Sequence, residues 1–65
     1  MKIIFGINDK VEYRGKYITI PYLTNGRVSR VFQHNKNILC VEWNIHGELK
    51  EIVVFSDEIV PYKWS

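Results

Sequence analysis

The sequence lacks most of the features with which small proteins reinforce their folds. Its 65 residues include one cysteine, Cys40, which excludes a disulfide within the chain. A chain of this length buries only about 60% of the surface that its unfolded form exposes. Small domains therefore often depend on disulfides, a structural metal or self-association. Without a disulfide, we expect one closely packed domain over residues 1–65, or an oligomer.

Long apolar runs are also missing. No run approaches the roughly 20 residues that cross a bilayer, and residues 1–6 are too short for the core of an export signal. A strand that begins at residue 2 is the simpler interpretation. A lone cysteine without an export signal suits a reducing compartment. We therefore expect a cytoplasmic protein with no membrane partner.

Charge of neither sign dominates, since the net charge is +2. The distribution is less even, because residues 1–40 hold seven Lys and Arg against two Asp and Glu, and residues 41–65 hold two against five. Such a division can present a basic face to an anionic partner. Alternatively, a fold that brings the two halves together would interleave the charges.

Turn-forming residues occur about every ten residues, and helical periodicity is absent. Asn, Asp and Gly punctuate the chain near positions 8–9, 14–15, 24–26, 34–37, 44–47 and 56–57. The segments between them are rich in Val, Ile and aromatic residues, which favour strands. One 3-10 turn fits at residues 57–59, before a short last strand that Pro61 restricts to an edge.

Alternation along the segments predicts which side chains share a face. In the segment 38–43, one face carries Leu39, Val41 and Trp43. In the first strand of the barrel, Val11 and Tyr13 share a face. We expect Tyr13 and Phe55 in the core, and Trp43 either in the core or at its rim. Val28 and Val31 are three positions apart, so a bulge would be needed to point both inward.

The order of these segments resembles the SH3-like barrels, a broad group that includes Tudor, KOW and PsaE-type domains. The resemblance covers residues 9–62: an opening strand at 9–13, a G-x-V-x-x-V strand at 26–31, a central strand at 39–43, and a closing strand, turn and final strand at 55–60. It implies an all-β fold, a single five- to six-stranded SH3-like barrel with at most one 3-10 turn before the last strand. Function varies widely within this group.

No catalytic, cofactor-binding or metal-binding arrangement is evident. Ser56 is distant in sequence from both histidines, and a hydrolase needs a nucleophile beside a base. His34, Cys40 and His46 are candidate metal ligands. If residues 34–46 form one strand, however, the two histidines are about 30 Å or more apart at ~3.3 Å per residue. We expect a protein without enzymatic activity, metal or cofactor.

Aromatic residues interleaved with Arg and Lys are the main indication of function. The chain has nine aromatic residues, more than a small barrel encloses, and Tyr17 and Tyr22 are the two that we expect to be exposed. Such residues suit a protein-binding hot spot or a stacking platform for bases. A Tudor-type cage for a methylated cation is a further alternative, with Tyr13, Tyr22, Trp43 and Phe55 as its candidates. The candidate binding residues are Arg14, Lys16, Tyr17, Tyr22, Arg27, Arg30, Trp43 and Trp64.

Two functions follow from these observations. The first is a protein-binding module that docks on a larger assembly through an aromatic patch or a free strand edge, which would also support a homodimer. Small bacterial and phage accessory proteins have a similar size and lack of catalytic groups. The second is a nucleic-acid binder that uses Arg14, Lys16, Arg27 and Arg30, although its modest charge is unusual for that class.

Overall fold

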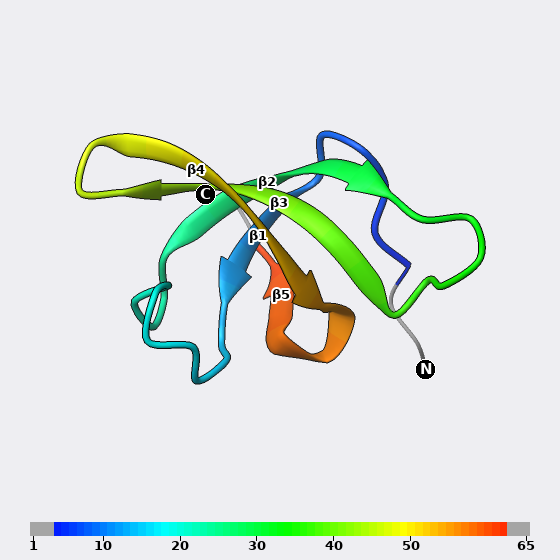
Figure 1. Cartoon of the computed structure of the whole chain (residues 1–65), viewed down its shortest axis with the longest axis horizontal. Helices are drawn as coiled ribbons and strands as arrows, with labels where there is room; N and C mark the ends of the chain where they lie inside the picture. The colour runs from blue at the N-terminus through cyan, green and yellow to red at the C-terminus, as the bar shows by residue number, and fades with distance from the viewer. Residues whose placement is uncertain (1–3, 63–65) are drawn as a thin grey trace.

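The computed structural model describes residues 4–62, which form one antiparallel sheet of five strands. The strands are β1 (Lys10–Tyr13), β2 (Asn25–Val31), β3 (Ile38–Ile45), β4 (Glu48–Phe55) and β5 (Ile59–Pro61), and the 3-10 turn η1 (Ser56–Glu58) precedes β5. Their order is β4-β3-β2-β1-β5, in a strongly twisted sheet (Figure 1). The prediction of an all-β fold with one 3-10 turn before the last strand is confirmed. Within residues 4–62 no ladder joins β4 to β5, so the sheet is not closed.

The longest ladder is the β3–β4 hairpin, which projects from one end of the molecule (Figure 1). Ile45 pairs with Glu48, so His46 and Gly47 alone form the connection. Both have positive φ angles, 52° and 84°. This conformation matches a tight turn to the twist of the flanking strands, and glycine adopts it without steric cost.

A bulge interrupts β2, as the sequence predicts. The pairing of β2 with β3 shifts between Val28, opposite Val41, and Arg30, opposite Cys40. Val28 is fully buried, but Val31 is exposed. In this register Val31 lies opposite the buried Leu39, on the same inner side as Val28, as the bulge predicts. It stays 37% exposed because it ends the strand where the chain leaves the sheet for the loop before β3.

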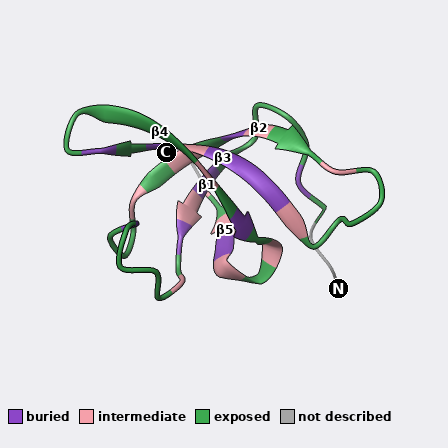
Figure 2. Ribbon diagram, viewed as in Figure 1, coloured by how far each residue is buried: buried purple, intermediate pink, exposed green. Residues whose placement is uncertain are grey.

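The core lies on the inner face of the twisted sheet. The predicted inward positions Leu39, Val41 and Trp43 are buried, and so are Val11 and Tyr13, which confirms both alternation patterns (Figure 2). The rings of Tyr13 and Trp43 meet edge to face at 5.5 Å between centroids, a favourable aromatic geometry. The remaining members of the core cluster are Phe5, Ile20, Val28, Ile45, Val54 and Ile59.

Phe55 lies outside the core, contrary to the prediction. Val54 pairs with Leu39 and Ile52 pairs with Val41, so the even-numbered residues of β4 share the inner face with core residues. The period of two along a strand then turns Leu49, Glu51, Val53 and Phe55 to the outer face. Phe55 is 54% exposed there.

The N-terminal segment does not contribute a strand in its described part. The sequence predicts a strand that begins at residue 2. Residues 2 and 3 lie outside the described residues, and residues 4–9 have no strand structure. Phe5 nevertheless packs into the core. In the described range 4–62, no helix is long and apolar enough to cross a membrane.

Candidate protein-docking surfaces

The loop between β1 and β2, residues 14–24, is held by the hydroxyl of Tyr13. This hydroxyl accepts a hydrogen bond of 2.8 Å from the backbone N–H of Tyr17 and donates one of 3.3 Å to Oε2 of Glu58. At the base of the loop, the backbone N–H of Leu23 donates to the Tyr13 carbonyl at 2.8 Å. Ile20, in the middle of the loop, is buried in the core. The loop is therefore anchored at its base, near its start and at its centre.

Gly15 lets the loop pass close to the Tyr13 hydroxyl. A Cβ at position 15 would collide with that oxygen and would lie 2.8 Å from Oε2 of Glu58. Only glycine fits there without displacing one of the two groups. The sequence therefore combines a turn residue, a buried tyrosine and a distant carboxylate to fix the path of this loop.

Apolar side chains project from the anchored loop into solvent. Ile18 is 100% exposed and Tyr22 is 62% exposed, and Tyr17 and Leu23 are about half exposed. In Figure 2 almost the whole loop is coloured as exposed. We call Tyr17, Ile18, Tyr22 and Leu23 the loop surface. Exposed apolar groups of this density in a short segment are typical of interaction sites.

The cation next to the loop surface is already paired. Nε of Arg14 lies 2.8 Å from Oε1 of Glu12, and this hydrogen bond raises the pKa of Arg14 further above its ordinary value. The guanidinium also lies 6.0 Å from the ring centroid of Tyr22, at the outer limit of a cation–π contact. Arg14 therefore supports Tyr22 and has one carboxylate partner of its own.

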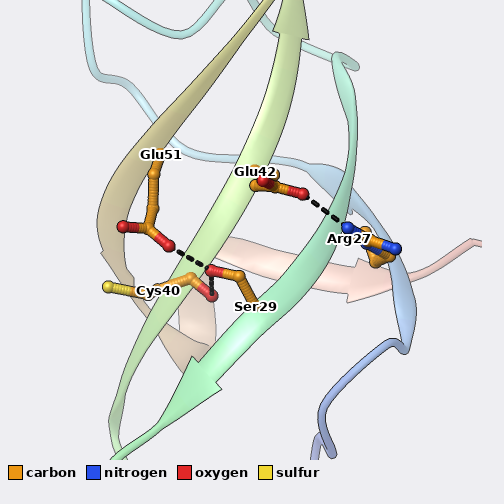
Figure 3. Close-up of polar contacts among 5 residues, drawn as sticks. All are labelled: Arg27, Ser29, Cys40, Glu42 and Glu51. Atoms are coloured by element: carbon orange, nitrogen blue, oxygen red, sulfur yellow. Dashed lines mark hydrogen bonds and ion pairs between the residues drawn. The ribbon is translucent and has the colours of Figure 1, made fainter.

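The outer face of the sheet carries a set of polar contacts between the two halves of the chain. Arg27 on β2 bonds Glu42 on β3 at 2.7 Å, and the hydroxyl of Ser29 donates to Glu51 on β4 at 2.7 Å (Figure 3). The antiparallel pairing of β2 with β3 brings residues from the basic half beside residues from the acidic half. The charges are interleaved at these positions, so they do not form one basic face.

A shallow depression of about 360 Å³ lies on this outer face and includes the Arg27–Glu42 pair. It is open to solvent, and Leu49 and Tyr62 are its largest apolar members. A ligand there would have to compete with an ion pair that is already formed. The depression therefore offers less to a partner than the loop surface does.

A second apolar surface runs along the outer side of β4. Leu49 is 71% exposed, Phe55 is 54% exposed, and Val53 is nearly half exposed. These three residues follow the two-residue period and are named here the β4 stripe. Cys40 pairs with Val53, so its side chain lies on the same outer side of the sheet. Unlike the β4 stripe, Cys40 is buried. The β4 stripe lies on an edge strand of the sheet.

The structure separates the candidate binding residues. Arg14, Lys16, Tyr17 and Tyr22 lie on the loop, all of them exposed, and the expectation of exposure for Tyr17 and Tyr22 is confirmed. Arg27 and Arg30 lie on β2, exposed, with the bulge between them.

Trp43 does not contribute to these surfaces. Trp43 is fully buried, because the inner face of β3 points into the core, so its assignment to a binding surface is wrong. Its Nε1 has no hydrogen-bond partner within the described chain. Trp64 lies outside the described residues.

An aromatic cage is not formed by the four candidates. Tyr13 and Trp43 pack on each other in the core, whereas Tyr22 and Phe55 are exposed on the loop and on β4. A cage needs rings that face a shared opening. The two buried rings have no free face to offer.

The histidines lie in exposed segments beyond the two ends of β3. His34 precedes the strand, His46 follows it, and Cys40 is buried between them. In the range 4–62, no group of three His, Cys, Asp or Glu side chains is placed to hold a metal ion.

Ile18, Leu23 and the β4 stripe were missed as surface residues. For the β4 stripe the sequence does not distinguish the two faces, since Glu51 interrupts the face of Leu49, Val53 and Phe55, and Lys50 interrupts the face of Ile52 and Val54. Charges therefore mark neither face of this segment as the solvent side. For Ile18 no signal exists, because the loop has no regular period and its neighbour Ile20 is buried.

Comparison of the chain with protein-family models, curated proteins and solved structures finds no match.

Proposed function

We propose that this protein is a small non-enzymatic module that docks on a partner protein through the loop surface. The observation that carries the proposal is the complete exposure of Ile18, together with Tyr17, Tyr22 and Leu23, on a loop that the core holds in place. A few residues, enriched in tyrosine and other aromatic types, supply most of the binding energy in protein interfaces. A modulating role on a larger assembly, and the relation to SH3-like barrels, remain predictions.

The anchoring of the loop supports this function. Association costs free energy when side chains and loops must become ordered, and a loop that is already fixed avoids part of that cost. The Tyr13 hydroxyl and buried Ile20 fix the backbone on both sides of Ile18. Exposed apolar groups on a fixed backbone form a ready contact surface.

Pairing of the cations weakens the case for nucleic acid as the principal ligand. Arg14 is bonded to Glu12 and Arg27 to Glu42, so two of the four proposed phosphate-binding cations have a carboxylate beside them. A phosphate would have to displace these carboxylates or bind next to them. Affinity for nucleic acid depends strongly on such phosphate contacts.

The test of the proposal is capture of the partner with matched variants. Immobilised wild-type protein should retain a specific protein from an extract of the cells in which it occurs, and Ile18→Asp and Tyr22→Asp should lose it. Ile7→Asp is the control, because Ile7 is also more than half exposed but lies outside the loop. Retention by both loop variants, or equal loss in the control, would contradict the proposal.

Binding of nucleic acid is the second candidate, favoured by the guanidinium of Arg14 at 6.0 Å from the ring of Tyr22 and by exposed Lys16 nearby in the loop. An amide NMR titration with short single- and double-stranded oligonucleotides at low and moderate salt distinguishes the two. Shifts within residues 14–32 that fade with salt, and that disappear in Arg27→Glu and Arg30→Glu, would favour this candidate. An unchanged spectrum at low salt would exclude it.

A further inference from the structure

The two edges of the sheet are protected to different degrees. β5 is three residues long and ends in Pro61, which has no backbone donor and discourages further pairing. β4 is eight residues long, contains no proline, and pairs only with β3 among the described strands. Its second edge therefore presents backbone donors and acceptors that could accept another strand, except the N–H of Phe55, which donates to Oε1 of Glu58 at 2.9 Å.

The side chains of β4 do little to repel a neighbour. The β4 stripe makes three of the four outer positions apolar. The fourth, Glu51, is directed toward β2 by its 2.7 Å hydrogen bond from Ser29 (Figure 3). Lys50, the only cation of the strand, lies 3.9 Å from Glu48 of the same strand. The charges of β4 thus have partners within their own sheet.

We propose that β4 pairs with β4 of a second copy of this chain, antiparallel and about a two-fold axis at Ile52. Residues that face each other across an antiparallel pair lie on the same side of the sheet. This register places Leu49 opposite Phe55 of the second copy, and Glu51 opposite Val53 of the second copy. By symmetry each contact occurs twice, so the apolar stripes of the two copies become continuous.

The charges select this register from its neighbours. An axis at Lys50 or at Glu51 would place each of these residues opposite itself, and like charges directly opposite each other are destabilising. With an axis at Leu49 or at Val53, fewer residues of the two strands would pair, because β4 begins at Glu48 and ends at Phe55. With the axis at Ile52, residues 49–55 of one copy face residues 55–49 of the other, and no two like charges face each other.

The dimer should be weak and concentration-dependent. An interface made by one pair of edge strands is smaller than the roughly 1,200–2,000 Å² that stable complexes bury. It would join the two five-stranded sheets into one continuous sheet. The inference does not rest on the proposed docking function, because the loop surface belongs to a different segment of the chain.

Sedimentation velocity over a range of protein concentrations tests the dimer and its register together. We expect wild type to shift from monomer toward dimer, and Leu49→Lys or Phe55→Glu alone to weaken the dimer on the order of tenfold. An equimolar mixture of these two variants should dimerise again, because the introduced lysine of one copy would then face the introduced glutamate of the other. Ile7→Lys, exposed but outside β4, is the control and should dimerise like wild type.

Two results would overturn the proposal. One is a wild-type protein that stays monomeric at every concentration, which would show that the free edge of β4 does not pair with a second copy. The other is a mixture that does not dimerise although both variants keep the wild-type circular dichroism spectrum. Should either variant fail to fold, amide exchange of wild type decides: protection of β4 must rise with protein concentration, and constant protection contradicts the dimer.

Discussion

Gly26 lies directly against the ring of Trp43. The two residues are paired between β2 and β3. A Cβ at position 26 would lie 2.5 Å from Cε3 of Trp43 and 2.7 Å from Cγ1 of Val41. Both neighbours are fully buried, so neither ring nor methyl group can move aside without displacing other core residues.

Gly26→Ala is therefore expected to destabilise the protein by roughly 1–3 kcal/mol, the usual cost of overpacking a core. Chemical denaturation measures the change in the free energy of unfolding. Gly6→Ala is the control, because the nearest atom to a Cβ there is Oδ2 of Asp9 at 3.8 Å. Equal stability of the two variants would contradict the close approach of Gly26 to Trp43.

Tyr13→Phe should loosen the loop that carries the loop surface. The substitution removes the acceptor of the Tyr17 N–H and the donor to Glu58. Both hydrogen bonds are part-buried, and loss of such a bond costs about 0.5–1.5 kcal/mol. We expect a loss of stability of that order and faster hydrogen exchange at the Tyr17 amide. Tyr17→Phe, which changes a half-exposed hydroxyl, should have little effect, and unchanged exchange at Tyr17 in Tyr13→Phe would disprove the anchoring.

Stability should fall at alkaline pH because of Tyr13. Burial raises the pKa of the Tyr13 hydroxyl above its ordinary value of about 10, and the nearby Glu58 raises it further. The folded protein keeps this proton where the unfolded chain loses it. The free energy of unfolding contributed by Tyr13 is thus constant below about pH 10 and decreases as the pH rises toward the pKa of the folded state.

Denaturation of wild type and Tyr13→Phe at a series of pH values isolates this contribution. Every other side chain is common to both proteins, so the difference between the two curves reports on Tyr13. The difference should narrow above about pH 10. Two parallel curves through that range would refute the assignment.

Cys40 should be unreactive in the folded protein. Its side chain lies between Arg30 and Val53 in the register of the sheet, and the residue is 7% exposed. A thiol reagent such as Ellman's reagent should therefore modify it only as fast as the protein opens. Complete modification within the mixing time, without denaturant, would contradict its burial.

Strand positions were predictable where the sequence has a clear period bounded by turns. Leu39, Val41 and Trp43 alternate with polar or small residues between two Asn-containing turns, and β3 covers that span with that inward face. The strand continues through Asn44 and Ile45, although the sequence pattern predicts them in the following turn. The short last strand followed from Pro61, and the bulge in β2 from the three-residue spacing of Val28 and Val31. These features depend on local backbone chemistry, which the sequence contains directly.

The inward face of β4 and the path of the β1–β2 loop could not be predicted in the same way. Both faces of β4 contain large apolar residues, so only its pairing with β3 decides that Val54 is buried and Phe55 exposed. Similarly, Ile18 and Ile20 are equally apolar, and the contacts of Tyr13 and the core select Ile20 for burial.

Turn chemistry and period-two patterns act over a few residues, so the all-β fold, the single 3-10 turn and the core positions of the two regularly alternating segments could be inferred from the order of the amino acids. The choice of which surplus apolar residues reach the surface is made at a longer range. A 65-residue chain that is 46% hydrophobic has more apolar side chains than its core can enclose. Those left outside are selected by strand register and by loop anchoring between residues far apart in the sequence, such as Tyr13 and Glu58.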